Sequence, residues 1–160
     1  MTIFGKSFSE YVRFQRVILW LILVVGGGRL ALSLGGVANS TAKWLSITAV
    51  IVIGAVFCAI KVHTSGFGRY KHLLPLLVIQ DGLAELIVAA SIVLAILTRK
   101  DNIFSAPEFS GGTDGKNWGH VGAHLLVGFV IAPIVFWIIG SLIMLVMKKI
   151  APATQTATGA

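Results

Sequence analysis

The sequence predicts an all-α membrane protein, folded as an antiparallel bundle of four transmembrane helices. Its 160 residues are 56% apolar and only 12% charged, whereas soluble domains average about 45–50% apolar and about 25% charged residues. The mean hydropathy of +0.91 agrees with this difference. Four apolar stretches also reach the roughly 20 residues that a helix needs to cross a hydrocarbon core. The composition therefore excludes a soluble enzyme, a disordered chain and a disulfide-stabilised secreted module.

The four predicted spans follow one another along a single domain over residues 1–150. They cover residues 17–38, 44–62, 73–98 and 118–147. Because lipid offers no partner for an unpaired backbone group, each span is expected to be helical. The last two spans exceed the minimum length, which indicates tilt or protruding ends. Pro133 removes one helical hydrogen bond and is expected to kink the fourth span.

Three connections of unequal length join the spans. Residues 38–43 are a tight turn, which predicts that the first two spans are antiparallel neighbours. Residues 63–72 form a basic loop. Residues 101–117 are the longest loop, and their glycine and acidic content fits either a functional loop or plain mobility. The tail, residues 151–160, has nothing to bury and is expected to be disordered.

The distribution of Lys and Arg predicts that both termini are cytoplasmic. Eight basic residues flank the spans on the side of the termini and four on the opposite side, and cytoplasmic loops carry the excess of positive charge. The eight are Lys6, Arg13, Arg16, Lys61, Arg69, Lys71, Lys148 and Lys149, and the four are Lys43, Arg99, Lys100 and Lys116. Trp44 and Trp118 begin spans on the outer side, where indoles favour the interface. We therefore expect a multi-pass protein of a plasma membrane, taken to be bacterial.

Small residues that recur every four positions predict the helix faces that pack together. Small side chains let two helix backbones approach closely in lipid. The stripes are Gly27, Ala31 and Gly35 on the first span, Gly54 and Cys58 on the second, and His120, His124, Gly128 and Ala132 on the fourth. Such stripes indicate packing and say little about function.

An intramembrane ionic cluster of Arg29, Asp81, Glu85 and His124 is the main candidate site. Ionisable groups in a bilayer cost about 3 kcal/mol each and usually face protein. Arg29 and Glu85 each lie twelve residues from the cytoplasmic start of their spans, roughly 18 Å deep. We therefore predict that Arg29 and Glu85 form an ion pair with His124 close by. The cluster is either a structural pin or a site where a proton, ion or polar substrate exchanges.

Asp81 precedes Glu85 by one helical turn and shares its face. Two carboxylates so close in a low dielectric are not both charged, so Asp81 is expected to be protonated near neutral pH. It then donates a hydrogen bond, for which Gln80 is the nearest partner, or serves as one step of a proton path.

The spacing His120-x-x-x-His124 places two imidazoles on one helix face, which suits a metal. Val121 occupies the position at which a zinc protease carries its general base, so that motif is absent. A metal would need Glu85 or Asp114 as third ligand. Haem is the other candidate cofactor, with a histidine as axial ligand.

These observations predict a small integral membrane protein without a resident cofactor, more a non-enzyme than an enzyme. It would act as an accessory subunit or as a small ion- or proton-linked carrier. The alternative is a redox or metal-dependent membrane enzyme with haem or a divalent metal on His120, His124 and Glu85. The expected partners are the lipid bilayer and either further copies of the chain or a larger membrane complex. No basic cluster carries interleaved aromatic side chains, so no nucleic acid is expected as a partner.

Overall fold

The structure, a computed structural model, describes residues 2–150 of the chain. It is mostly helical (76%), so apart from one short hairpin the predicted all-α class is confirmed. Four helices are long and apolar enough to cross a membrane. The tail predicted to be disordered, residues 151–160, lies outside the described residues.

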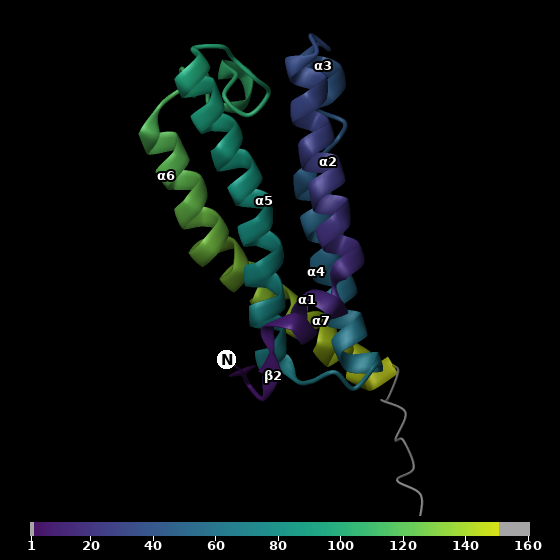
Figure 1. Cartoon of the computed structure of the whole chain (residues 1–160). Helices are drawn as coiled ribbons and strands as arrows, with labels where there is room; N and C mark the ends of the chain where they lie inside the picture. Colours follow the sequence, from purple (N-terminus) through teal and green to yellow (C-terminus); the bar gives the residue numbers. More distant parts are fainter. Residues whose placement is uncertain (1, 151–160) are drawn as a thin grey trace, which may run out of the picture.

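The elements follow in the order of Figure 1. The chain begins with a two-stranded hairpin, β1 (Thr2–Ile3) and β2 (Lys6–Ser7), and a short helix, α1 (Phe8–Phe14). The next elements are α2 (Arg16–Leu34), the single turn α3 (Asn39–Ala42), α4 (Ile47–Thr64) and α5 (Tyr70–Thr98). A 3-10 turn, η1 (Pro107–Phe109), precedes the last helical segment, which consists of α6 (Trp118–Leu126), the π-helical turn η2 (Val127–Ile131) and α7 (Ala132–Ile150).

Each predicted span contains a long helix, with ends set by local capping. The helix α2 ends at Leu34 because Gly36 takes a left-handed conformation with φ +84°, which a glycine adopts without strain. The helix α4 begins at Ile47 because the Ser46 hydroxyl accepts a hydrogen bond from the Ala49 amide at 3.2 Å. At the predicted kink, the π-helical turn η2 lies directly ahead of Pro133.

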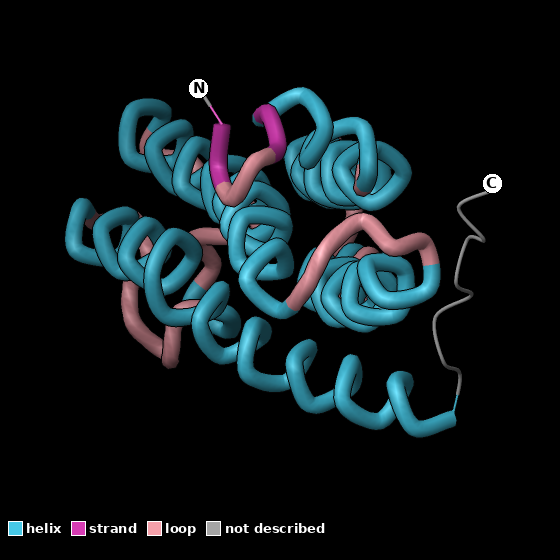
Figure 2. Tube along the Cα trace, turned by 90° about the horizontal axis from the view of Figure 1, so that it is seen from below, coloured by secondary structure: helices cyan, strands magenta, loops and turns pink. Residues whose placement is uncertain are grey.

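The four long helices alternate in direction around α5, as Figure 1 shows. The helix α5 packs against α2, α4, α6 and α7. Seen from below in Figure 2, the last helical segment lies obliquely across the other helices. As a result, α6 packs against α5, while α7 packs against both α4 and α5. We call the end with β1, β2 and α1 the hairpin end, and the opposite end, with α3 and residues 99–117, the loop end.

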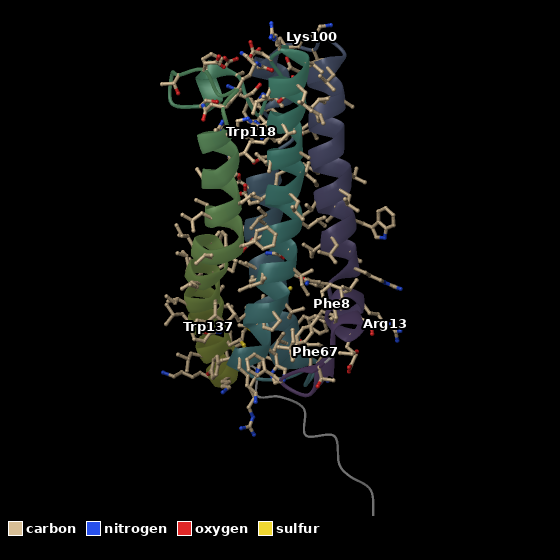
Figure 3. All side chains as sticks on the ribbon, turned by 60° about the vertical axis from the view of Figure 1, so that its left-hand side comes forward. Phe8, Arg13, Phe67, Lys100, Trp118 and Trp137 are labelled. Atoms are coloured by element: carbon tan, nitrogen blue, oxygen red, sulfur yellow. The ribbon has the colours of Figure 1, made fainter. Side chains whose placement is uncertain are left out.

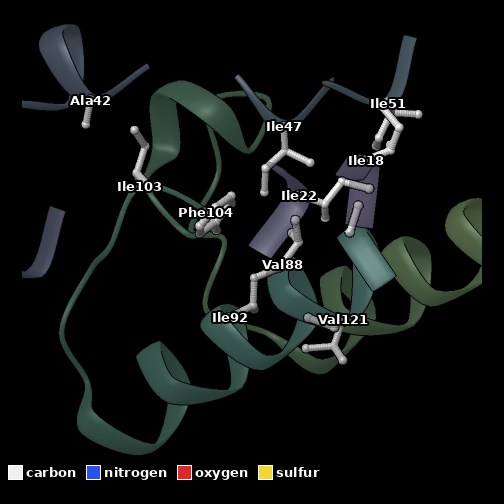
Figure 4. Packing of buried hydrophobic residues seen from close by; sticks show 12 residues of the cluster. Ile18, Ile22, Ala42, Ile47, Ile51, Val88, Ile92, Ile103, Phe104 and Val121 are labelled. Atoms are coloured by element: carbon white, nitrogen blue, oxygen red, sulfur yellow. The ribbon is translucent and has the colours of Figure 1, made fainter. Parts of the chain in front are cut away.

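Two apolar clusters fill the bundle. The cluster toward the loop end joins Ile22 of α2, Ile47 of α4 and Val88 of α5 (Figure 4). Ile103 and Phe104 from the connection between α5 and α6 belong to the same cluster. The second cluster, toward the hairpin end, includes Leu73, Leu76 and Leu77 of α5, together with Cys58 and Val62 of α4 and Met144 of α7.

The N-terminal hairpin and α1 were not predicted by the sequence, and they cover the hairpin end. A capping box starts α1, in which Ser7 and Glu10 bond each other's backbone amides. The hydrogen bond from the Ser7 amide holds the pKa of Glu10 below its ordinary value. Tyr11 is fully buried, and its hydroxyl donates to the Ile3 carbonyl at 2.9 Å. Phe67 packs beside this segment (Figure 3) and forms a ring contact with Tyr11 at 5.7 Å.

Polar contacts anchor the N-terminal segment to the bundle. Gln15 separates α1 from α2 and is fully buried, and its Nε2 donates to the Leu76 carbonyl at 3.0 Å. The thiol of Cys58 lies 3.8 Å from the Gln15 Oε1 and donates to it. The Lys61 ammonium donates to the Phe14 carbonyl at 3.0 Å. Burying these polar groups with partners avoids the cost of leaving them unpaired.

The small-residue stripes were predicted correctly on α4 and on the last helical segment but not on α2. A Cβ at Gly128 would meet the side chain of Glu85, and one at Gly54 would meet Gln80 and Ile18, so both glycines face neighbouring helices. Gly27 is exposed with no neighbour within 4 Å of the position of a Cβ. The face of α2 that packs carries Ile18, Ile22 and Gly26 instead. The correction has a physical reason: burial of large apolar side chains, and not the small stripe, orients this helix.

Candidate functional site

A continuous chain of hydrogen bonds runs from the middle of α5 to the loop end. The Glu85 Oε2 lies 2.6 Å from the His124 Nδ1, and the two form an ion pair when the histidine is protonated. The His124 Nε2 lies 3.1 Å from the Nε2 of His120. The His120 Nδ1 lies 2.9 Å from the carbonyl of Gly115. We call Glu85, His124 and His120 the relay.

Local helix geometry places the two imidazoles in line. Asn117 caps α6, its side chain accepting from the His120 amide at 2.8 Å, so the helix begins just ahead of the histidines. Residues four apart lie on one helix face. Gly128, one further turn along, leaves room for the Glu85 side chain, which packs where a Cβ would stand. The sequence predicted the two histidines and Glu85 but not their order of contact.

The three contacts of the relay set how many protons a fully hydrogen-bonded arrangement requires. A carbonyl only accepts, so the His120 Nδ1 carries a proton. Each of the other two contacts also needs one proton between its two heavy atoms, which makes three protons in all. Two neutral imidazoles supply only two of them. When all three contacts are hydrogen bonds at once, one further proton is shared by the relay, and its net charge is then zero because that proton balances the Glu85 carboxylate.

The shared proton has three places to reside without breaking a contact. It protonates Glu85, or it makes His124 an imidazolium, or it makes His120 an imidazolium. Passing between these states moves a proton along each short contact and leaves the heavy atoms in place. Loss of the proton, in contrast, leaves two lone pairs facing each other in at least one contact. The arrangement is thus chemically suited to taking up, moving and releasing one proton.

The predicted Arg29–Glu85 ion pair is wrong. Within residues 2–150, no carboxylate lies within ion-pair distance of Arg29, and Glu85 pairs with His124. The guanidinium of Arg29 lies over the rings of Phe104 and Phe109 instead, with its Cζ 5.1 and 5.5 Å from the two centroids. The physical reason is the length of the side chain. Arg29 is five residues from the end of α2 and reaches toward the loop end, where cation–π contacts compensate for lost water.

Arg29 and the relay nevertheless face the same cavity, which measures about 220 Å³. Its walls come from α2, α4, α5, α6 and the connection between α5 and α6. The residues with polar or aromatic groups along it are Arg29, Thr48, Glu85, Phe104, Phe109 and His124. The Nε of Arg29 is buried and has no hydrogen-bond partner among the described residues. The cavity therefore has a cation at one wall and a shared proton at another.

The 99–117 loop closes this region, so plain mobility does not describe all of it. Residues 102–106 are buried. Asn102 anchors them, since its Nδ2 donates to the Ser91 carbonyl at 2.7 Å and its Oδ1 accepts from the Phe104 amide at 2.9 Å. The Ile103 amide donates to the Ser33 hydroxyl at 2.8 Å, which joins the loop to α2. The loop thus holds Phe104 over the cavity.

Lys116 joins the start of the 99–117 loop to its end. Its ammonium lies 2.6 Å from Asp101 and 3.0 Å from Asp114. The hydrogen bond with Asp101 raises the pKa of Lys116, and the hydrogen bond from the Lys116 amide lowers the pKa of Asp114. This ion cluster lies beside Gly115, whose carbonyl ends the relay.

Asp81 lies apart from the contacts of the relay. It is 1% exposed, and within residues 2–150 neither carboxyl oxygen has a hydrogen-bond partner. The Gln80 Nε2 donates to the Ile51 carbonyl at 3.1 Å, and the Gln80 Oε1 is likewise without a donor. The protonation of Asp81 stays a prediction. It is supported because the two Asp81 oxygens and the Gln80 Oε1 are all acceptors without a donor among the described residues.

Beyond Asp81 and Gln80, largely apolar packing closes the bundle toward the hairpin end. Leu73, Leu76 and Leu77 of α5 are at most 1% exposed, and Cys58 of α4 is fully buried. The hydrogen-bond chain that begins at the Gly115 carbonyl therefore ends at Glu85.

Metal binding at His120, His124 and Glu85 stays a prediction, as does haem. No group of three or more His, Cys, Asp and Glu side chains arranged for a metal is found over residues 2–150. In the described geometry the imidazole nitrogens of His120 and His124 contact one another and Glu85. They form a chain of pairs and do not surround a common point.

Neither the family models nor the curated proteins nor the solved structures include a match for this chain. The geometry of the site is therefore the basis for inferring a function. Sequence reasoning missed the Gly115 carbonyl, Phe104 and Phe109. No residue-type pattern marks a backbone carbonyl, and the aromatic pair is recognisable only once the loop is known to fold back on α2.

Proposed function

We propose that the protein is a multi-pass membrane protein that acts as a small proton-linked carrier. The four long apolar helices support membrane insertion. The single observation that carries the proposal is the relay, a half-buried hydrogen-bond chain with one shared proton, beside a polar cavity. Ionisable chains of this kind inside membrane segments are typical of proton-coupled transport.

A carrier is favoured over an open proton channel. A channel needs a continuous polar path, whereas beyond Asp81 and Gln80 the hairpin side of the bundle is filled largely by the buried leucines of α5. A proton taken up from the loop end can cross only if the packing on that side changes. Such alternating access couples the proton to a solute in the cavity and prevents a leak.

The proposed carrier works as several copies or with a partner subunit. Four helices enclose a narrow space, and α2 and the last helical segment are each only 17% buried in the structure. Their outward faces are apolar and suit lipid or another chain. We also propose that both termini lie in the cytoplasm, since the basic flanks of the spans gather at the hairpin end.

The carrier function is tested in vesicles that contain the purified protein and an entrapped pH indicator. Formate, lactate, nitrate, chloride, phosphate, glycine and choline are added one at a time, and vesicles without protein measure passive entry. At least one solute is expected to enter together with protons. Glu85→Gln and His124→Gln are expected to lower this movement at least tenfold, because each removes a position of the shared proton.

Glu10→Gln is the matched control. It makes the same chemical change at the hairpin end, and glutamine also serves in a capping box. Its proton movement is expected to equal that of the wild type. Proton movement that no solute elicits, or that survives both relay substitutions, would contradict the proposed function. An absorbance spectrum with a haem band, or stoichiometric bound metal, would instead favour the redox or metal-dependent enzyme.

A further inference from the structure

We propose that the cavity binds a small monocarboxylate, and that Arg29 pairs with its carboxylate. This inference rests on the proposed function and names the class of the solute. It starts from a charge imbalance. The charged side chains along the cavity are Arg29, Glu85 and His124, and with its shared proton the relay has no net charge. The cavity therefore has a net charge of +1.

A cation so placed calls for a mobile counterion. Within the described residues no hydrogen bond or ion pair engages any nitrogen of Arg29, and its Nε is buried. The side chain as a whole is half-buried, and a charge withdrawn from water is costly unless it is paired. A guanidinium presents five N–H donors in a planar fork that matches a carboxylate in a bidentate manner. The cation–π contacts with Phe104 and Phe109 engage none of its N–H groups in a conventional hydrogen bond, so these donors stay available.

The dimensions of the cavity limit the ligand. Liquid water occupies about 30 Å³ per molecule, so the cavity of about 220 Å³ corresponds to about seven water-sized volumes. Sites for drug-sized ligands begin at about 300 Å³. Apolar walls from Ile47, Ile51 and Val88 favour a short alkyl chain behind the carboxylate. Acetate, propionate and lactate have this size and chemistry.

The charge balance also couples the anion to the proton. When the relay loses its shared proton, its net charge becomes −1, and together with Arg29 the cavity is neutral. The anion is then no longer attracted. One proton and one monocarboxylate should therefore bind together, and their joint movement transfers no net charge.

The groups that could alter this titration have defined positions. On α5, Asp81 lies one turn from Glu85, and the charged group that α2 contributes along the cavity is Arg29. The loop contributes Lys116 with Asp101 and Asp114 next to Gly115. Along the cavity wall α4 contributes no titratable side chain, only Thr48 among polar groups.

The test is calorimetric titration of acetate into the full-length protein in detergent micelles, in two buffers with different ionisation enthalpies. We expect one acetate per chain. The difference between buffers should report uptake of up to one proton per acetate, at a pH at which the free relay has lost its shared proton. Arg29→Gln should weaken acetate binding at least tenfold. Arg13→Gln, at an exposed arginine of α1 (Figure 3), should leave it unchanged.

Further arms separate the possible sources of the signal. If chloride binds as tightly as acetate, the ligand of the cavity is an inorganic anion. If glycine binds more tightly than acetate, the ligand is a zwitterion. Either result overturns the monocarboxylate. If Arg29→Gln does not fold, Arg29→Lys decides, since it keeps the charge but lacks the planar fork. It is expected to bind acetate about tenfold more weakly, and unchanged binding would contradict the role of Arg29.

Failure of this inference is distinguishable from failure of the proposed function. If acetate does not bind but another solute moves protons in a manner that requires His124, the cavity holds a different solute and the carrier function stands. If acetate binds through Arg29 without proton uptake at any pH, and His124→Gln leaves its affinity unchanged, the anion site stands and the proton linkage is wrong.

Discussion

At the scale of single residues, the site depends on the close approach of a carboxylate to a glycine. Gly128 allows the Glu85 side chain to lie against the last helical segment, and in this position its Oε2 meets the His124 Nδ1 at 2.6 Å. A larger residue at position 128 would occupy the same space as Glu85. Close packing of the backbone therefore determines the geometry of the proton contact.

Gly128→Ala is expected to destabilise the protein by about 1–3 kcal/mol, because an added methyl group would overlap the Glu85 side chain. The same substitution should change the His124 imidazole resonances in a ¹⁵N NMR spectrum. Gly27→Ala is the matched control on an open helix surface. There alanine should stabilise the helix by about 0.5–1 kcal/mol. Equal unfolding midpoints for the two variants would mean that Glu85 does not pack on Gly128.

The sequence identified the residues of the site but mispaired one of them. Depth along each span correctly placed Glu85 near His124, because both belong to regular helices with a fixed rise per residue. Depth alone failed for Arg29, since its side chain is long and selects its partners by direction as well as by height. Its actual partners, Phe104 and Phe109, come from the loop, for which the sequence gives no periodic signal.

At the scale of elements, the 99–117 loop is the part whose role the structure changes most. From the sequence, the glycine and acidic residues of this loop fit a mobile loop as well as a functional one, yet residues 102–106 are buried in the bundle. The reason lies in side-chain and backbone hydrogen bonds that no periodic pattern predicts, such as those of Asn102 to Ser91 and of Ile103 to Ser33. Helix ends were predicted within a few residues because the apolar stretches end close to the helix termini.

The ion cluster of Lys116, Asp101 and Asp114 predicts a pH range within which the loop is ordered. The pKa of Asp114 is lowered by the hydrogen bond from the Lys116 amide, so this contribution to loop order is present above the ordinary value of 3.8 and is lost as the pH falls below it. The pKa of Lys116 is raised, chiefly by Asp101, so its contribution is present below 10.5 and is lost as the pH rises through the raised value.

Limited proteolysis measures this pH range. With a protease active over a wide pH range, and with rates corrected on an unstructured peptide, cleavage within residues 107–116 should accelerate below about pH 4 and above about pH 10.5. Lys116→Gln should show fast cleavage at pH 7 as well, whereas Lys100→Gln, outside the ion cluster, should resemble the wild type. Cleavage rates that do not vary with pH would mean that these ion pairs do not order the loop.

At the scale of the whole molecule, the hairpin end and the loop end differ in chemistry. The hairpin end is sealed by Tyr11, Gln15 and the leucines of α5, and the loop end has the cavity and the relay. The four-helix architecture follows from hydropathy alone and was predicted correctly. The sealing N-terminal segment was not, because its polar and aromatic residues show neither helical nor strand periodicity over a sufficient length.

The proposed orientation predicts which positions react with a reagent that does not cross membranes. In a Cys58→Ser background, a cysteine introduced at Thr113 of the loop end should react from outside intact bacterial cells. A cysteine at Ser65, in the basic connection after α4, should react only after the cells are opened. Accessibility of both positions from the same side would contradict the antiparallel arrangement, and the reverse pattern would invert the orientation.

The π-helical turn η2 offsets the rotational phase between α6 and α7. Its hydrogen bonds reach one residue further than those of an α-helix, which amounts to one inserted residue. Deleting a residue there would restore ordinary winding and rotate one half against the other by roughly 100°. With α7 fixed on α4 and α5, His124 would turn away from Glu85. A single inserted residue thus lets one continuous segment present imidazoles to α5 in one half and apolar packing in the other.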